Sequence, residues 1–304
     1  MKIKVLDPLI ASKIAAGEVI ERPSSVIKEL VENSIDANST TIEIEIINGG
    51  MDLIKIIDNG EGITKEDLPL AIKRHATSKI DTIDDLSFLI SMGFRGEALA
   101  SIAAVSQMEL SSKPLESPAG SNIQVENSTI LNEKPVSMIN GTSIIVNNLF
   151  YNLPARKKFM STQKSESNRI LRLVNHFCVT YPEIRFKLII DEKQKINTIG
   201  NGELIYTIAK ILSQNLANEL IPVDFTDNDF KISGYISPPH ISRTNRSNIL
   251  YSVNKRIVKD KLITMALEQA YRGFLTVGRF PITVLDLSTN PSKVDINVHP
   301  RKDE

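Results

Sequence analysis

Several residue types are scarce in this chain of 304 residues, and each scarcity excludes a class of protein. A single cysteine, Cys178, can form neither an internal disulfide nor a cysteine-cluster metal site, which indicates a reducing compartment. Tryptophan is absent and aromatic residues make up 5%, which argues against a stacking platform for single-stranded nucleic acid. No apolar run is long enough to span a bilayer, and Asp7, Pro8 and Lys13 interrupt the N-terminal stretch, so we expect neither a membrane span nor a secretion signal.

The formal net charge of the chain is zero, because 36 basic residues balance 36 acidic ones. An arm that binds nucleic acid by bulk charge is therefore excluded, and any basic surface must be local. Two such clusters occur, in residues 154–172 and 241–261. Each is either a solvated surface or a contact for a phosphate backbone. With 41% hydrophobic and 24% charged residues, the composition is that of a folded globular chain.

The pattern of apolar residues predicts an alternation of helices and strands, and hence an α/β or α+β fold. Residues 23–37 have a helical apolar stripe, with Ser24 or Ser25 as the expected N-cap. Residues 41–47 alternate strictly between isoleucine and polar side chains and pair in a hairpin with residues 53–57. Further along we expect a helix at 64–74, a mobile loop at 75–95 and a helix after Gly96. Strands are expected at 106–112, 121–126 and 142–150, a helix at 162–179, and a hairpin at 184–190 and 194–199.

The Gly200-Asn201-Gly202 segment is the clearest domain boundary in the sequence. It predicts a first domain over residues 1–200 and a second, smaller α/β domain over 203–304. In the second domain we expect helices at 203–213 and 260–274, and strands at 219–225, 230–237, 248–254, 281–288 and 293–298. No terminating turn follows the last of these, so the expectation is a second domain truncated at its C-terminal end, in a fragment of a longer protein.

The common nucleotide and metal motifs are absent from the sequence. It contains no G-x-x-x-x-G-K-[ST], no G-x-G-x-x-G and no H-E-x-x-H, so a P-loop, a Rossmann cofactor site and a zinc protease are unsupported. The four histidines are scattered along the chain. Cys178 stands beside Phe177 and Val179 in a helical run, so we expect it in the core rather than as a nucleophile.

Glu29 and Asn33 form the first candidate site. At about 100° per helical residue they point the same way, one turn apart, at the margin of the buried stripe. A carboxylate and an amide so placed offer oxygen atoms to a water molecule and a cation. On this pair alone, an exposed polar face is the simpler explanation.

Two glycine-containing segments form the other candidates. Asp58 ends a strand, and Gly60 and Gly62 after it leave room for a ligand, although the same residues also make a tight turn. Residues 93–102 lead into a helix whose free N–H groups favour an anion, with Arg95 and Lys79 as nearby cations. An ordinary glycine-containing helix start explains this segment equally well.

In order, these motifs resemble the four-motif ATP site of the GHKL superfamily, which includes gyrase-type topoisomerases, chaperones of the ninety-kilodalton heat-shock class, histidine kinases and MutL. The motifs are ELVENSIDA, DNGEGI, HATSK and GFRGEALASI, followed by Gly141-Thr142 before a strand. The opening IASKIAAGEVIERPSSVIKELVENSIDA, together with FYNLPARKKF and VDINVHPRK, resembles the MutL family of DNA mismatch-repair proteins, in its amino-terminal ATPase part. The resemblance implies an α+β fold, in which a GHKL-type α/β sandwich precedes a smaller α/β domain of ribosomal-protein-S5-like fold.

The resemblance also implies roles for individual residues. Glu29 would be the general base for the attacking water, and Asn33 would hold Mg²⁺ through its amide oxygen. Asp58 would accept a hydrogen bond from the adenine amino group, where the carbonyl oxygen of guanine would face a carboxylate without a donor. The remaining ATP contacts would be made by Gly60, Gly62 and Thr142 near the base, by Thr77, Ser78, Lys79, Gly93, Phe94, Arg95, Gly96, Glu97 and Ala98 around the phosphates, and by Lys302 at the γ-phosphate.

Beyond the pocket, the resemblance implies an ATP lid over residues 75–95 and a dimerisation segment over residues 1–20. ATP would order the lid and pair two copies, and slow hydrolysis would release them. Arg256 would lie in a DNA-binding groove. The implied partners are double- or single-stranded DNA, the mismatch-recognition protein MutS, a downstream nuclease or helicase and a second copy of the chain. The expected location is the bacterial cytoplasm, or the nucleus in a eukaryote. Two alternatives stay open: another GHKL ATPase, such as a topoisomerase subunit, chaperone or histidine kinase, or a nucleotide-binding scaffold without turnover.

Overall fold

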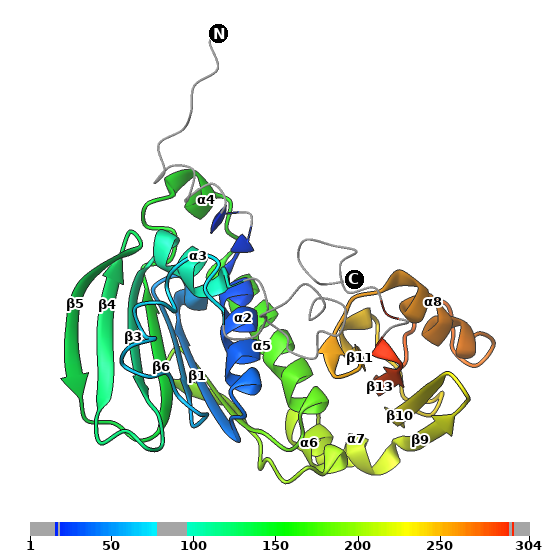
Figure 1. The fold of residues 1–304 in the computed structure, drawn as a ribbon. Coiled ribbons are helices and arrows are strands. Elements are labelled where there is room, and N and C mark those ends of the chain that lie inside the picture. Colours follow the sequence, from blue (N-terminus) through cyan, green and yellow to red (C-terminus); the bar gives the residue numbers. More distant parts are fainter. Residues whose placement is uncertain (1–15, 18, 78–95, 292–293, 295–304) are drawn as a thin grey trace. The chain divides into compact units, whose positions relative to one another are not determined.

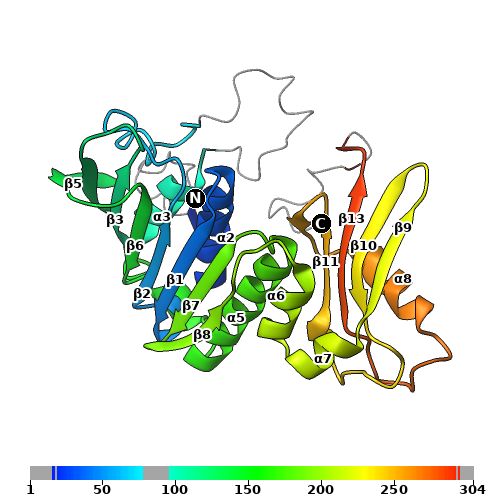
Figure 2. The same cartoon turned by 90° about the horizontal axis from the view of Figure 1, so that it is seen from below.

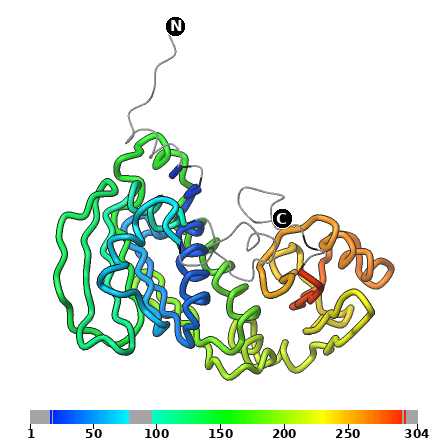
Figure 3. Tube along the Cα trace, in the orientation of Figure 1, coloured from blue at the N-terminus to red at the C-terminus, as the bar shows by residue number. Residues whose placement is uncertain are grey.

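A computed structural model describes residues 16–17, 19–77, 96–291 and 294 of the chain. The chain divides into two compact units. The first consists of residues 1–173 and 185–197, and the second of residues 174–184 and 198–304. The path of the chain through them can be followed by colour in Figure 3. The second half of the long helix α5 thus belongs to the second unit, a division that the glycine-rich segment at 200–202 does not reveal.

The first unit is built on an eight-stranded mixed sheet with the order β5-β4-β3-β6-β2-β1-β7-β8. Its strands are β1 (Thr41–Ile47), β2 (Leu53–Asp58), β3 (Gln107–Lys113), β4 (Gly120–Glu126), β5 (Thr129–Val136), β6 (Gly141–Asn147), β7 (Arg185–Ile190) and β8 (Lys193–Asn197). The β1–β7 pair is parallel and the other pairs are antiparallel. The predicted hairpin of β1 and β2 is confirmed, with Ile44 opposite Ile56.

Strict alternation of side chains decides which face of the sheet is buried. Ile42, Ile44 and Ile46 of β1 are at most 1% exposed, while the residues between them are half-buried. Burial of each such side chain contributes about 1.5–3 kcal/mol. Figures 1 and 2 show the helices on one side of this sheet. They are α2 (Pro23–Asp36), α3 (Ala98–Val105) and the first part of α5 (Gln163–Thr180), and α4 (Pro154–Lys158) is a short helix beyond β6.

Helix α2 begins one residue earlier than its serines suggest. Arg22 is the N-cap, no side chain caps the helix, and Pro23 occupies its first turn. The expectation of Ser24 or Ser25 as the cap is therefore wrong, because proline, which has no N–H to satisfy, already starts the helix at Pro23. The buried side of α2 carries the predicted stripe, including Val26, Ile27 and Leu30.

Three further expectations need correction. Residues 64–74 form consecutive turns rather than a helix, since bonds from Leu68 N to Thr64 O alternate with shorter-range bonds such as that from Leu70 N to Asp67 O. The strand predicted at 142–150 ends at Asn147, because φ is positive at Asn148 and Phe150. Strand β5 was not predicted at all, because its mostly exposed residues show no alternation.

The second unit has a five-stranded sheet with the order β12-β11-β13-β10-β9. Its strands are β9 (Ile221–Thr226), β10 (Phe230–Ile236), β11 (Ile249–Val253), β12 (Arg256–Ile257) and β13 (Thr283–Thr289), and its helices are α6 (Leu204–Ile211), α7 (Gln214–Glu219) and α8 (Lys261–Ala270). Adjacent residues of β13 point to opposite faces: Val284 packs in the core beneath α6 and α7, and Leu285 packs in the core beneath α8. The helix predicted over 260–274 ends four residues early, at Ala270. All but residue 294 of the strand predicted at 293–298 lies outside the described residues.

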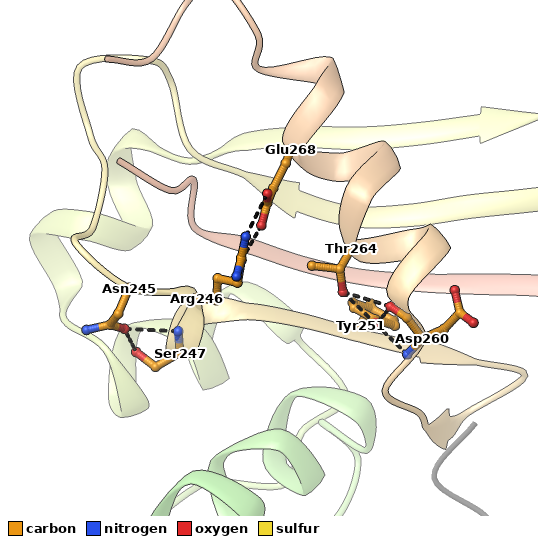
Figure 4. A network of polar contacts seen from close by, with 7 residues as sticks. All are labelled: Asn245, Arg246, Ser247, Tyr251, Asp260, Thr264 and Glu268. Carbon is orange, nitrogen blue, oxygen red and sulfur yellow. Dashed lines mark hydrogen bonds and ion pairs between the residues drawn. The ribbon is translucent and has the colours of Figure 1, made fainter. Parts of the chain in front are cut away.

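Polar contacts fix α8 on this sheet (Figure 4). Asp260 caps the helix by accepting from Ile263 N at 2.8 Å. The Tyr251 hydroxyl donates to Asp260 O at 2.7 Å and accepts from Asp260 N at 2.8 Å. Further along, the Arg246 guanidinium is paired with Glu268, so part of the second basic cluster is neutralised within the unit.

The described residues contain no helix whose length and apolarity would suit a membrane crossing. Cys178 is 0% exposed, and burial raises the pKa of its thiol. The prediction that it belongs to the core rather than to a reactive site is confirmed.

Candidate nucleotide-binding site

Asp58 is the centre of a polar cluster at the end of β2. It is 7% exposed, and three donors from different elements converge on its carboxylate. The Ser34 hydroxyl on α2 donates to Oδ2 at 2.7 Å. Gly60 N and Thr142 N donate to Oδ1 at 2.9 Å and 3.2 Å. A helix, a turn and the neighbouring strand β6 therefore all fix the orientation of this one side chain.

The carboxylate oxygens of Asp58 accept hydrogen bonds and, while ionised, cannot donate them. Ser34 donates to Oδ2, and Gly60 N and Thr142 N donate to Oδ1. An amino group of a ligand is a donor from which such a carboxylate can accept, whereas it would repel a carbonyl oxygen at the same place. The chemistry of this site therefore fits adenine better than guanine.

Burial dominates the acidity of Asp58 and raises the pKa of its carboxyl group. Hydrogen bonds from Gly60, Ser34, Thr142 and Ser39 act in the opposite direction, because they stabilise the charged form. A buried carboxylate that depends on neighbouring donors is a common feature of binding sites.

The glycines after Asp58 allow a close-packed turn in which any other residue would clash with the protein. A Cβ on Gly60 would lie 2.6 Å from both Ala37 O and Ser39 Oγ. Gly62 has φ of +76°, and its Cβ would lie 2.5 Å from Lys113 O. The Ser39 hydroxyl is buried at the same place and helps to lower the pKa of the Asp58 carboxyl group. The turn after β2 is therefore closely packed against the end of α2.

Thr142 is linked to the same site through Ser112 on β3. The two hydroxyls lie 2.9 Å apart, and Ser112 Oγ also accepts from Ile63 N at 2.8 Å. Ser112 thereby joins the turn after β2 to the start of β6. Asp58, Gly60, Gly62 and Thr142, which the sequence predicts as one group, lie together in the structure.

Glu29 and Asn33 lie on α2 and are half-buried, as their place at the margin of the apolar stripe predicts. Asn33 directly precedes Ser34, whose hydroxyl contacts Asp58, so one helix carries the pair and this contact. One amide oxygen and one carboxylate suit Mg²⁺, which takes few protein ligands and completes its shell with water and phosphate oxygens. The described residues contain no cluster of three or more His, Cys, Asp or Glu for a metal held by protein alone.

The start of α3 supplies the candidate phosphate site. Gly96 has φ of +60°, Glu97 is the N-cap, and Ala98 is the first residue of the helix. His75 N donates to Gly96 O at 3.1 Å, which brings the exposed Thr77 into the same part of the unit. Helices α2 and α3 pack against each other. The free N–H groups at the start of α3 therefore belong to a helix that contacts the one carrying Glu29 and Asn33.

Several predicted site residues cannot be placed in this way. Ser78, Lys79, Gly93, Phe94, Arg95 and Lys302 lie outside the described residues, as do most of the expected lid at 75–95 and most of the segment at 1–20. Arg256 is described: it lies half-buried in the short strand β12 of the second unit.

Sequence reasoning missed Ser34, Ser39 and Ser112. Ser34 gave a signal, because it is a polar residue on the buried face of an otherwise apolar helical stripe. Such a residue must find a partner in the core. Ser112 gave none, because its role depends on the pairing of β3 with β6.

Comparisons with known proteins agree with this architecture. Residues 20–149 match the family described as histidine kinase-, DNA gyrase B-, and HSP90-like ATPase, and residues 208–304 match the DNA mismatch repair protein, C-terminal domain. A solved structure described as the N terminal domain of a DNA repair protein aligns with a TM-score of 0.84 at 26% identity, over 97% of this chain and 91% of that one. The Aquifex aeolicus MutL ATPase domain complexed with ADP aligns with a TM-score of 0.68 at 27% identity, over 90% and 94%.

The first unit and its polar pocket thus define a GHKL-type ATPase fold. The chain is also 46% identical over 303 residues to the DNA mismatch repair protein MutL of Streptococcus uberis, and 42% identical over 300 residues to that of Shouchella clausii. It covers 46% of the length of each, and these alignments include 100% and 99% of this chain. The chain belongs to the MutL family of DNA mismatch-repair proteins.

Proposed function

We propose that this chain binds ATP with Mg²⁺ and hydrolyses it slowly, as the ATPase part of a mismatch-repair protein. The observation that carries the proposal is the Asp58 cluster, in which donors from α2, from the turn at Gly60 and from β6 fix a buried carboxylate beside the Gly60–Gly62 turn. In this proposal Asp58 binds the adenine amino group, with Gly60, Gly62 and Thr142 around the base. Its deep burial makes a mismatched group there costly.

Hydrolysis in this proposal depends on α2. Glu29 orients the attacking water and takes its proton, and Asn33 holds Mg²⁺. The metal supplies charge neutralisation to the phosphates when it is bound. Thr77, Gly96, Glu97 and Ala98 bind the phosphates together with Ser78, Lys79, Gly93, Phe94 and Arg95, and Lys302 contacts the γ-phosphate.

The biological role that we propose is a nucleotide-driven switch. ATP closes the lid over residues 75–95 and pairs two copies through residues 1–20, which couples mismatch recognition by MutS to a downstream nuclease or helicase on DNA. Arg256 contributes to DNA binding, and the protein works in the bacterial cytoplasm. The support for this role is the membership of the chain in the MutL family. The relatives that show this membership are more than twice as long as the chain.

A comparison of Glu29→Gln with Glu45→Gln tests the proposal. Glu45 lies on β1 and its substitution makes the same chemical change outside the pocket. We expect Glu29→Gln to lose phosphate release by at least about 100-fold while ATP binding stays within a few-fold, since general-base catalysis contributes about 10²–10⁴-fold. Normal turnover in Glu29→Gln would contradict the assignment of the base. Binding without turnover in the unaltered chain would favour a scaffold.

A further inference from the structure

The segment Phe150–Phe159 plays no part in the nucleotide pocket, yet the structure gives its beginning a definite place. Phe150 is 0% exposed with φ of +62°, and its N–H donates to Val105 O at 2.7 Å. Asn152 Nδ2 donates to Ala104 O at 2.9 Å. Both acceptors belong to the last turn of α3, whose carbonyls have no partner within the helix. The segment is therefore bound to the end of α3 that lies opposite the expected phosphate site.

Arg156, on α4 within this segment, contacts the residues that precede α2. Its Nη1 donates to Ile20 O at 2.7 Å and also to Gly17 O. The guanidinium lies 5.7 Å from the centroid of the Phe150 ring. Figure 1 shows α4 next to the beginning of α2. A planar guanidinium can stack on a ring and bond two carbonyls at once, which an ammonium group cannot do with the same geometry.

The opposite side of this contact is fitted to Arg156. A Cβ on Gly17 would lie 2.9–3.1 Å from three atoms of the guanidinium, so only glycine leaves the arginine in place. Ile20 is 0% exposed, and its N–H donates to Ala16 O at 2.8 Å. Two residues further on, Arg22 occupies the N-cap position of α2, and its Nη1 lies 3.7 Å from Oε1 of Glu166, a residue that is 1% exposed.

We propose that Arg156 is a positioning residue that clamps the backbone at Gly17 and Ile20 and so fixes the point from which the N-terminal segment extends to a second copy of the chain. This inference rests on the proposed function for the pairing step. Helix α3 begins at the expected phosphate site and ends on Phe150 and Asn152, next to Arg156. A single rigid helix thus joins the nucleotide to the base of the segment, and the clamp reduces the freedom that pairing would otherwise have to remove.

Two substitutions test the clamp from its two sides, and a third is the control. Arg156→Gln removes the donor, Gly17→Ala displaces it, and Lys157→Gln changes the neighbouring exposed residue of α4. The first measurement is hydrogen exchange of the Ile20 amide in the nucleotide-free 304-residue chain. We expect exchange about tenfold faster in Arg156→Gln and Gly17→Ala, no change in Lys157→Gln, and an intermediate rate in Arg156→Lys. Unchanged exchange in both clamp variants would overturn the inference.

The second measurement separates positioning from general stability. We expect kcat for ATP to fall about tenfold in Arg156→Gln with KM and melting temperature nearly unchanged, and crosslinking of two copies by a non-hydrolysable ATP analogue to fall with it. Two results for Arg156→Gln would overturn the positioning role. One is faster hydrogen exchange over the whole first unit, and the other is an unchanged kcat although the Ile20 amide exchanges faster. If the unaltered chain forms no analogue-dependent dimer, the pairing step of the proposed function is wrong. The Ile20 comparison then still decides whether Arg156 holds the segment.

Discussion

The hydroxyl of Ser34 donates to Oδ2 of Asp58 at 2.7 Å, and Leu30 O, at 3.2 Å, is a second and more distant acceptor for the same hydrogen. This hydroxyl joins the helix that carries Glu29 and Asn33 to the strand end that carries the proposed adenine acceptor. Any change in the register of α2 over the sheet would break it. The relationship therefore explains why a small hydroxyl, rather than an apolar residue, lies on the buried face of this helix.

Substitution Ser34→Ala tests this link. A hydrogen bond to a charged group contributes about 1.5–3 kcal/mol, and the loss leaves Asp58 with fewer donors. We expect ATP affinity to fall by about tenfold, as measured by titration calorimetry. Ser25→Ala is the matched control on the same helix, because Ser25 is half-buried and no hydrogen bond of its side chain is present among the described residues. Equal affinities in the two variants would contradict the link.

Substitution Asp58→Asn tests purine selectivity. The asparagine oxygen can still accept from Gly60 N and Thr142 N, while its amino group would face the amino group of adenine. Two opposed donors cost about 1–3 kcal/mol, so ATP binding should weaken at least tenfold. The amino group suits the carbonyl oxygen of guanine, so the preference for ATP over GTP should narrow. Asp52→Asn, in the exposed turn before β2, should leave both affinities unchanged.

The raised pKa of Asp58 predicts a pH dependence of stability. The folded state holds the proton more tightly than the unfolded chain, whose carboxyl titrates near the ordinary value of 3.8. The contribution of Asp58 to the free energy of unfolding is therefore greatest below that pH and declines as the pH rises through the native pKa. Relative to Asp58→Asn, the unaltered chain should lose stability between pH 3.8 and neutrality. Urea unfolding of both proteins across this interval measures the difference, and a constant difference would refute it.

Gly62 and Gly202 have similar positive φ angles, so alanine substitutions at the two positions separate the cost of the left-handed conformation from the cost of a steric clash. Gly62 has φ of +76° with Lys113 O 2.5 Å from an added Cβ, and Gly202 has φ of +81° with nothing within 4 Å. Alanine at either position costs about 1–2 kcal/mol for the left-handed conformation. Only Gly62→Ala must also displace backbone, so it should destabilise the fold by at least about 1 kcal/mol more. Chemical unfolding of both variants gives the comparison, and equal losses would exclude a close-packed turn at Gly62.

Local patterns were sufficient wherever the physical cause is local. The alternation at Ile42, Ile44 and Ile46 predicted β1, because period two alone decides which side chains face a core. Residues 64–74 were predicted to form a helix, but they form turns, and only Leu68 and Ile72 of this short stretch are buried. Strand β5 was missed because its pairing with β4, rather than its own sequence pattern, makes it a strand. The ribosomal-protein-S5-like character of the second unit stays a prediction.

By itself the sequence determined the order of the motifs, the residues grouped at Asp58 and the placement of Glu29 and Asn33 at the margin of α2. It did so because residues within one turn, helix or strand are related by fixed geometry. Only the tertiary structure decided that Ser34 and Ser112 complete the Asp58 cluster and that Arg156 binds the carbonyls of residues 17 and 20. Those contacts join residues that are 24, 30, 139 and 136 positions apart in the sequence. Local periodicity cannot predict which residues come into contact over such separations.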